Sequence, residues 1–171
     1  MLIFSYGSNM FTPRLIERVP SAAKVAIAYL PGYVFACNKV STDGSTKGNI
    51  ISSEEENAKV WGVVYTIDPD EKPKLDVAEG LGNGYEESIV TVFDGNGNVY
   101  NAQVYIGAQT HINNELGPYD WYKDFMLAGA VLNHLPEFDL ALIQSLNATV
   151  DPDEARRTKN YKVLGKLSPP R

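Results

Sequence analysis

The alternation of apolar and polar residues predicts a chain of short strands with few helices. An apolar run, Leu2-Ile3-Phe4, opens the chain, and six further runs are rich in β-branched and aromatic residues. These runs cover residues 25–29, 33–40, 49–52, 60–67, 85–93 and 99–106. Turn residues join most of them, most clearly at residues 94–98, so we expect a mostly antiparallel sheet.

Two short helices are predicted in the first half of the chain. The first has Thr12 as its N-cap and Pro13 at the first helical position. In the second, Asp70 is the predicted N-cap and Gly80 marks the end. Pro73 falls in its first turn, where the missing N–H costs nothing.

Two longer helices are predicted late in the chain, at residues 119–135 and 137–146. The inward stripe of the first contains Tyr122, Phe125, Met126 and Gly129. The second repeats the pattern with Phe138, Leu142 and Leu146.

Together these elements favour an α+β class with a single domain: a small, mixed, mostly antiparallel β-barrel flanked by helices. We expect the domain to cover residues 1–150. Residues 151–171 are polar and contain two consecutive prolines near the end, which indicates a covering arm or a loose tail.

Composition narrows the class of protein. The chain has 171 residues, of which 44% are hydrophobic, and this suits one domain with a full core. Its net charge of −6 and the lack of a basic run argue against a nucleic-acid surface. With no apolar run near ~18 residues and no leader pattern, we expect no membrane contact and a cytoplasmic protein. Cys37 is the only cysteine, so an internal disulfide is excluded.

A glycine turn after the first strand can form an anion site. The segment Ser5-Tyr6-Gly7-Ser8-Asn9 lies between the apolar run and the first helix. Gly7 permits close approach of the backbone to a ligand, and the free N–H groups of the turn and helix start point to one place. The alternative is an ordinary tight turn with capping side chains, which is the commoner use of such a triplet.

The second helix places a carboxylate where burial is expected. Leu75 and Glu79 are four residues apart on one face, with Ala78 beside them. Burial disfavours the charged form of a carboxyl group, which suits a general base or acid working near pH 7. The alternative is that Glu79 bends to solvent or pairs with a lysine. We prefer the catalytic interpretation because three glycines within residues 80–84 permit close backbone approach at the mouth of a site.

Other chemistries find less support. His111 and His134 lack the spacing of metal ligands, so no metal site is expected. Ser8 lacks the Gly-x-Ser-x-Gly elbow that exposes a nucleophile. Cys37 lies in an apolar strand and is predicted to belong to the core. Tyr122 lies on an inward stripe where its hydroxyl needs a partner, and core packing and substrate contact are about equally supported.

Several segments, in the same order, resemble the gamma-glutamylcyclotransferase family. They are Tyr6-Gly7-Ser8-Asn9 followed by Pro20-Ser21-Ala22-Ala23, the strand Val60-Trp61-Gly62-Val63-Val64, the motif Leu75-Asp76-x-x-Glu79-Gly80, and Tyr122-Lys123 with Gly129-Ala130 and Leu135-Pro136. The stretch between Glu79 and Tyr85 is one residue shorter than in the animal enzymes, and residues 38–48 have a sequence of their own. Both segments flank the expected pocket, so they bear on preference beyond the glutamyl group.

This resemblance implies a compact barrel in which the first turn holds the glutamyl end of the substrate. It assigns proton transfer to Glu79. The implied substrate-binding residues are Ile3, Phe4, Ser5, Tyr6, Gly7, Ser8 and Asn9, together with Tyr85 near the glutamate and Tyr122 from the late helix.

The implied reaction cyclises a γ-glutamyl amide to 5-oxoproline and releases an amine. The substrate's α-amine is its own nucleophile, so no metal and no cofactor are required. Glu79 takes a proton from the ammonium group and returns it to the departing amine, while turn N–H groups hold the α-carboxylate or the oxyanion.

The resemblance favours a γ-glutamyl amino acid as substrate, and γ-glutamylamines and glutathione are alternative substrates. A non-catalytic member that binds a small acidic metabolite or a protein is the alternative from another class. We expect a small-molecule partner, no nucleic acid and no membrane. A homodimer is compatible with the sequence.

Overall fold

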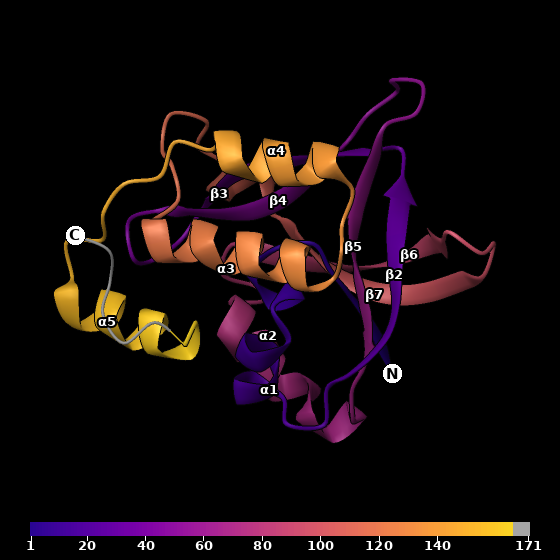
Figure 1. Ribbon diagram of the computed structural model, residues 1–171, viewed down its shortest axis with the longest axis horizontal. Helices are drawn as coiled ribbons and strands as arrows, with labels where there is room; N and C mark the ends of the chain where they lie inside the picture. The colour runs from indigo at the N-terminus through magenta and orange to yellow at the C-terminus, as the bar shows by residue number, and fades with distance from the viewer. Residues whose placement is uncertain (166–171) are drawn as a thin grey trace.

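A computed structural model, which describes residues 1–165, shows a closed five-stranded barrel with helices packed around it (Figure 1). The order around the barrel is β1 (Leu2–Ser5), β5 (Lys59–Thr66), β2 (Ala23–Pro31), β6 (Tyr85–Asp94) and β7 (Val99–Gly107). Neighbouring strands are antiparallel except β1 and β7, whose parallel contact at Ile3 and Gln103 closes the barrel. The predicted α+β class with a mixed, mostly antiparallel barrel is confirmed.

Two further strands form a separate sheet beside the barrel. β3 (Tyr33–Val40) and β4 (Thr46–Ser52) pair antiparallel around a turn at residues 41–45. The carboxylate of Asp43 holds this turn by accepting hydrogen bonds from the N–H and the hydroxyl of Ser45, at 3.0 and 2.8 Å. β4 begins earlier than the predicted residue 49, so Lys47 and Gly48 belong to a strand rather than to a loop.

The helices cover one side of the barrel and its lower end. They are α1 (Thr12–Arg18), α2 (Lys72–Glu79), α3 (Asp120–Leu132), α4 (Glu137–Ser145) and α5 (Glu154–Val163). Figure 1 shows α3 next to α4, α1 beside α2, and α5 at the edge of the molecule. Single 3-10 turns at Ser8–Met10, Pro69–Glu71 and Gln109–His111 connect them to the strands.

Both predicted N-caps of the early helices are wrong. Thr12 is the first residue of α1, and its hydroxyl hydrogen-bonds with that of Tyr65 at 3.0 Å. Asp70 does not cap α2; instead Asp68 caps the preceding 3-10 turn by accepting the N–H of Asp70 at 3.0 Å. Gly80 ends α2 as predicted, because its φ of 73° is a left-handed conformation that glycine adopts without strain.

The predicted buried face is correct for α3 and wrong for α4. In α3, Tyr122, Phe125, Met126 and Gly129 are all buried, as predicted. In α4, Phe138 is 77% exposed, and the buried residue is Ile143. α4 has apolar residues on more than one face, and only its packing against α3 decides which face is covered.

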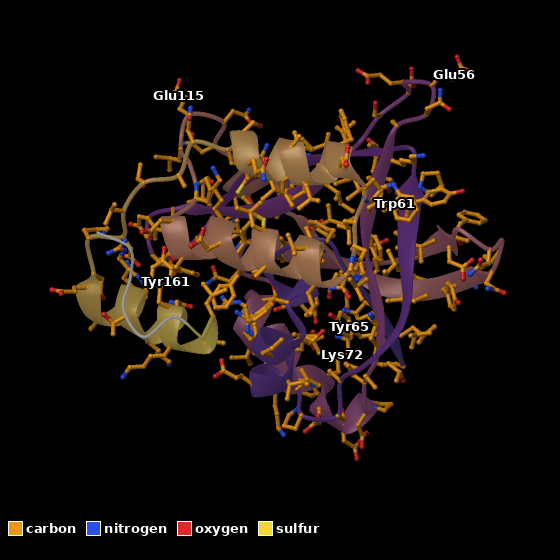
Figure 2. All side chains as sticks on the ribbon, viewed as in Figure 1. Glu56, Trp61, Tyr65, Lys72, Glu115 and Tyr161 are labelled. Atoms are coloured by element: carbon orange, nitrogen blue, oxygen red, sulfur yellow. The ribbon has the colours of Figure 1, made fainter. Side chains whose placement is uncertain are left out.

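The polar segment after residue 150 contains a packed helix. Asp151 precedes α5, accepts a hydrogen bond from Trp121 Nε1 at 2.7 Å and pairs with Arg156 at 2.6 Å. Tyr161 of α5 is buried (Figure 2). Residues 166–171 of the predicted arm lie outside the described residues, and the division of the chain at residue 150 stays a prediction. Within residues 1–165, no helix is both long and apolar enough to span a bilayer.

Candidate active site

Segments far apart in sequence line one pocket, which we call the inner pocket. The space between its lining residues is about 350 Å³, a value that includes space open to solvent. Its lining residues are Phe4, Ser5, Tyr6, Gly7, Ser8, Asn9, Gly48, Glu79, Tyr85, Tyr105 and Tyr122. The structure therefore brings together every predicted site residue except Ile3, which is buried in the hydrophobic core.

The glycine turn forms one wall of this pocket. It follows β1 directly and continues into the 3-10 turn, in which Met10 donates its N–H to the Gly7 carbonyl at 3.0 Å. The N–H groups of Ser8 and Asn9 precede the first donor of the turn, so they have no acceptor within it. An anionic or carbonyl oxygen is the kind of group that these two N–H groups would bind, and the anion site stays a prediction.

Glu79 lies opposite this turn, at the end of α2. Two donors reach a single oxygen of its carboxylate: Asn9 Nδ2 lies 2.8 Å from Oε1, and Arg18 Nη1 lies 2.5 Å from it. Within the described residues, Oε2 receives no hydrogen bond. Oε2 is therefore the oxygen that can exchange a proton with a bound ligand.

The surroundings of Glu79 differ from those expected. Leu75 is fully buried, as its place on the helix predicted, but Ala78 is exposed and the side chain of Glu79 is 17% exposed. Its partner is the guanidinium of Arg18 and not a lysine. The carboxylate of Glu79 is therefore mostly shielded from solvent and also forms an ion pair, so its surroundings are more polar than the apolar helix face predicted. Arg18 and Asn9 fix its position by hydrogen bonding.

Two tyrosines of the pocket are held by the backbone of Gly48. The hydroxyl of Tyr122 accepts the Gly48 N–H at 2.9 Å, and the hydroxyl of Tyr85 donates to the Gly48 carbonyl. Gly48 has no partner in the β3–β4 register, because the register shifts between Ala36 and Lys39. The tyrosines satisfy these backbone groups instead. The proton of Tyr122 has no acceptor in residues 1–165, so this hydroxyl can donate to a ligand.

The pocket tyrosines are neutral donors and not bases. Burial raises the pKa of Tyr6, Tyr85 and Tyr122 above its ordinary value. Tyr6 already donates to the Tyr105 carbonyl at 2.5 Å. Glu79 is the one carboxylate that lines the inner pocket, so it is the group there able to accept a proton.

A second cavity opens beside the first, and we call it the outer chamber. It shares Ser8, Glu79, Tyr85 and Tyr122 with the inner pocket. Its remaining lining residues are Arg14, Arg18, Lys39, Ser41, Lys47 and Ala78. None of these residues was predicted at the site, nor were Gly48 and Tyr105 of the inner pocket. The only signal was the unusual sequence of residues 38–48, which contains Lys39, Lys47 and Gly48.

Comparison with known proteins identifies the family. The family model described as gamma-glutamyl cyclotransferase, AIG2-like, matches residues 3–124. The chain belongs to this family. The match to the gamma-glutamyl cyclotransferase family runs from β1 into α3 and includes the glycine turn, Glu79 and Tyr122. The resemblance seen in the sequence is therefore confirmed.

Individual members of the gamma-glutamyl cyclotransferase family are similar over most of the chain. Gamma-glutamylcyclotransferase of Bos taurus is 32% identical over 139 residues, which cover 79% of this chain and 72% of the relative. The Homo sapiens protein of the same name is 31% identical over 139 residues, with the same coverage of 79% and 72%. A solved structure of a protein named gamma-glutamyl cyclotransferase has a TM-score of 0.82 at 25% identity, and covers 95% of this chain and 98% of that one.

Proposed function

We propose that this protein is a γ-glutamylcyclotransferase that converts a γ-glutamyl amide to 5-oxoproline and a free amine, with Glu79 as the proton carrier. The observation that carries the proposal is the position of Glu79: its Oε2 is open, and it shares the inner pocket with the donors of the glycine turn. The names of the relatives favour the same reaction.

The reaction needs positioning and proton transfer rather than a nucleophile of the protein. The substrate's α-nitrogen forms a bond to its own γ-carbonyl carbon, and the bond from that carbon to the amide nitrogen breaks. The α-ammonium loses two protons and the departing nitrogen gains two, so Glu79 ends the cycle in its initial state. Holding the folded conformer of the substrate supplies much of the rate, since the attack is intramolecular.

Each wall of the inner pocket has a role in this proposal. The N–H groups of Ser8 and Asn9 hold the α-carboxylate or the developing oxyanion. The free proton of Tyr122 is a further donor to the same end of the substrate. Arg18 and Asn9 keep Glu79 in place, since both donate to Oε1 and leave Oε2 for the substrate. A small-molecule partner, a cytoplasmic setting and a homodimer stay predictions.

The test is release of 5-oxoproline by the purified chain from γ-glutamyl-alanine, glutathione and γ-glutamyl-lysine. We expect release from at least one of them, and a loss in kcat of about 10²- to 10⁴-fold in Glu79→Gln, because this change keeps the shape and removes the base. Circular dichroism verifies the fold of the variant.

Glu86→Gln is the matched control, because Glu86 is an exposed glutamate on β6 outside both cavities. We expect its turnover to equal that of the wild type. Folded Glu79→Gln protein with normal turnover would show that the proton carrier is misassigned. No 5-oxoproline from any of the three substrates would favour a binding protein over an enzyme.

A further inference from the structure

The outer chamber concentrates positive charge in a protein that is acidic as a whole. The chain has a net charge of −6, yet Arg14, Arg18, Lys39 and Lys47 all line this one cavity. Arg18 pairs with Glu79, and Lys47 pairs with Asp43 at 2.7 Å. Arg14 and Lys39 form no ion pair with any carboxylate in residues 1–165.

Lys39 is the more unusual of these two cations. It is 4% exposed, and its ammonium lies 4.3 Å from the ring centre of Tyr85. Within the described part of the chain, this ammonium has no hydrogen-bond acceptor. Lys39 Nζ is not among the fully buried polar atoms that lack a partner, so the ammonium itself stays accessible from the outer chamber, which also contains Glu79. An anionic ligand in this chamber would give the ammonium an acceptor that residues 1–165 do not provide.

The pairing of β3 with β4 places a second positive charge close to Lys39. Lys39 and Lys47 are direct partners across the two strands, so their side chains lie on one face. Like charges in this position repel each other and destabilise a strand pair. Asp43 compensates Lys47 through a direct ion pair, whereas within residues 1–165 Glu79 and Asp43 act on Lys39 without direct contact.

Other groups shape the position of the Lys39 side chain. A Cβ atom on Gly84 would lie 2.6 Å from Lys39 Cε and 2.9 Å from Nζ, so the end of the lysine occupies space that only a glycine leaves open. Gly84 also has a φ of 112°, which disfavours any other residue. The loop after Glu79 therefore leaves room at Gly84 for the ammonium of Lys39 on the wall of the outer chamber.

Arg14 of α1 is the second cation of the outer chamber without an ion pair. Its guanidinium donates to Ser8 Oγ at 3.2 Å and to Asn160 Oδ1 at 3.0 Å, and lies over the ring of Phe125. All of these partners are neutral. Burial and the neighbouring Arg18 lower the pKa of Arg14 to about 9, as expected for a cation without a counter-ion.

We propose that Lys39 is a specificity-determining residue whose ammonium binds a carboxylate of the departing amine. This inference rests on the proposed function. There the glycine turn holds the glutamyl end of the substrate in the inner pocket, so the remainder of the substrate extends past Glu79. The outer chamber is the cavity that adjoins the inner pocket at Glu79, and its unpaired cations complement an anion.

The chemical consequence is a choice between two substrate classes. An amine that departs from an amino acid or a peptide carries a carboxylate, which Lys39 can bind by charge-assisted hydrogen bonds. A simple alkylamine lacks that group and leaves Lys39 unpaired. The structure thus favours γ-glutamyl amino acids and peptides over γ-glutamylamines.

The test uses two substrates that differ in one carboxylate, γ-glutamyl-alanine and γ-glutamyl-ethylamide. We expect kcat/KM of the wild type to be about 10- to 100-fold higher for γ-glutamyl-alanine, the range of a hydrogen bond to a charged group. Equal values for the two substrates would overturn the assignment without any variant. If these two substrates, glutathione and γ-glutamyl-lysine all fail to release 5-oxoproline, the proposed function fails and the inference falls with it.

Lys39→Met then assigns the selectivity to this residue, because methionine has a similar length and no charge. We expect kcat/KM for γ-glutamyl-alanine to fall about 10- to 100-fold and that for the ethylamide to fall much less. An equal fall for both substrates would mean that Lys39 acts on the glutamyl end, and would overturn the proposal. Lys59→Met is the matched control, since Lys59 is exposed on β5 and lines neither cavity.

Discussion

The inner pocket and the outer chamber adjoin at Glu79 but differ in the charge of the side chains that line them. Neutral groups form most of the inner pocket, and the hydroxyls of Tyr6, Tyr85 and Tyr122 are bound to backbone groups of the protein. Four of the ten residues that line the outer chamber are cations, and two of these, Arg14 and Lys39, form no ion pair with a carboxylate within residues 1–165.

This difference separates two demands on one site. A reacting group needs a fixed geometry, and satisfied hydrogen bonds to the main chain provide it in the inner pocket. Selection of a charged substrate needs an interaction that only the substrate completes, and the unpaired cations of the outer chamber offer one. Changes to the inner pocket should therefore cost stability, and changes to the outer chamber should mainly alter selectivity.

The largest effect on stability is expected in the inner pocket. Tyr122→Phe leaves the Gly48 N–H without an acceptor, and Tyr85→Phe leaves the Gly48 carbonyl without a donor. A buried backbone group that loses its partner costs about 1–3 kcal/mol in the free energy of unfolding, which urea denaturation measures. Tyr29→Phe is the control, because its hydroxyl makes no hydrogen bond with residues 1–165. A loss no larger than that of the control would contradict the role given to Gly48.

A smaller and pH-dependent effect is expected for Asp43→Asn in the turn of the β3–β4 hairpin. Burial by itself would raise the pKa of Asp43, but hydrogen bonds from Lys47 and Ser45 bring it below its ordinary value of 3.8. A carboxyl group with a lowered pKa contributes stability above its ordinary pKa, and loses it as the pH falls through the lowered value. We expect the variant to lose about 1 kcal/mol at neutral pH.

Urea denaturation of the wild type and of Asp43→Asn at neutral pH and at about pH 3 tests this sign. The difference in the free energy of unfolding should shrink at the lower pH, because the carboxyl group of Asp43 binds a proton more readily in the unfolded chain than in the folded one. A difference that stays constant, or grows in acid, would show that the carboxylate charge of Asp43 does not stabilise the hairpin.

The smallest effect on stability is expected for Lys39→Met. The change removes the charge of a largely buried side chain and its repulsion from Lys47, and it loses the contact with the ring of Tyr85. These effects oppose each other, so we expect the free energy of unfolding to change by less than about 0.5 kcal/mol. Denaturant unfolding of the folded variant measures it. A loss as large as that of Tyr122→Phe would make Lys39 a structural residue and remove the contrast between the two cavities.

The sequence alone predicted the elements and the inner pocket well, because their signals are local. Alternation located all the barrel strands, Gly80 marked the end of α2, and the apolar stripe of α3 placed Tyr122 inside. The motif residues from Phe4 to Asn9, with Glu79, Tyr85 and Tyr122, do line one pocket. Errors arose where a local pattern allowed several answers, as for the exposed Phe138 of α4 and the N-caps expected at Thr12 and Asp70.

Only the tertiary structure decided what surrounds these residues. Arg18 and Glu79 are 61 residues apart, and Tyr122 and Gly48 are 74 apart, so no local period connects them. The parallel closure of β1 onto β7 and the register that sets Lys39 opposite Lys47 also depend on how the whole chain returns on itself. Local sequence fixes backbone propensity and which side of an element is apolar, whereas the charge and the hydrogen-bond partners of a site are set by contacts between distant segments.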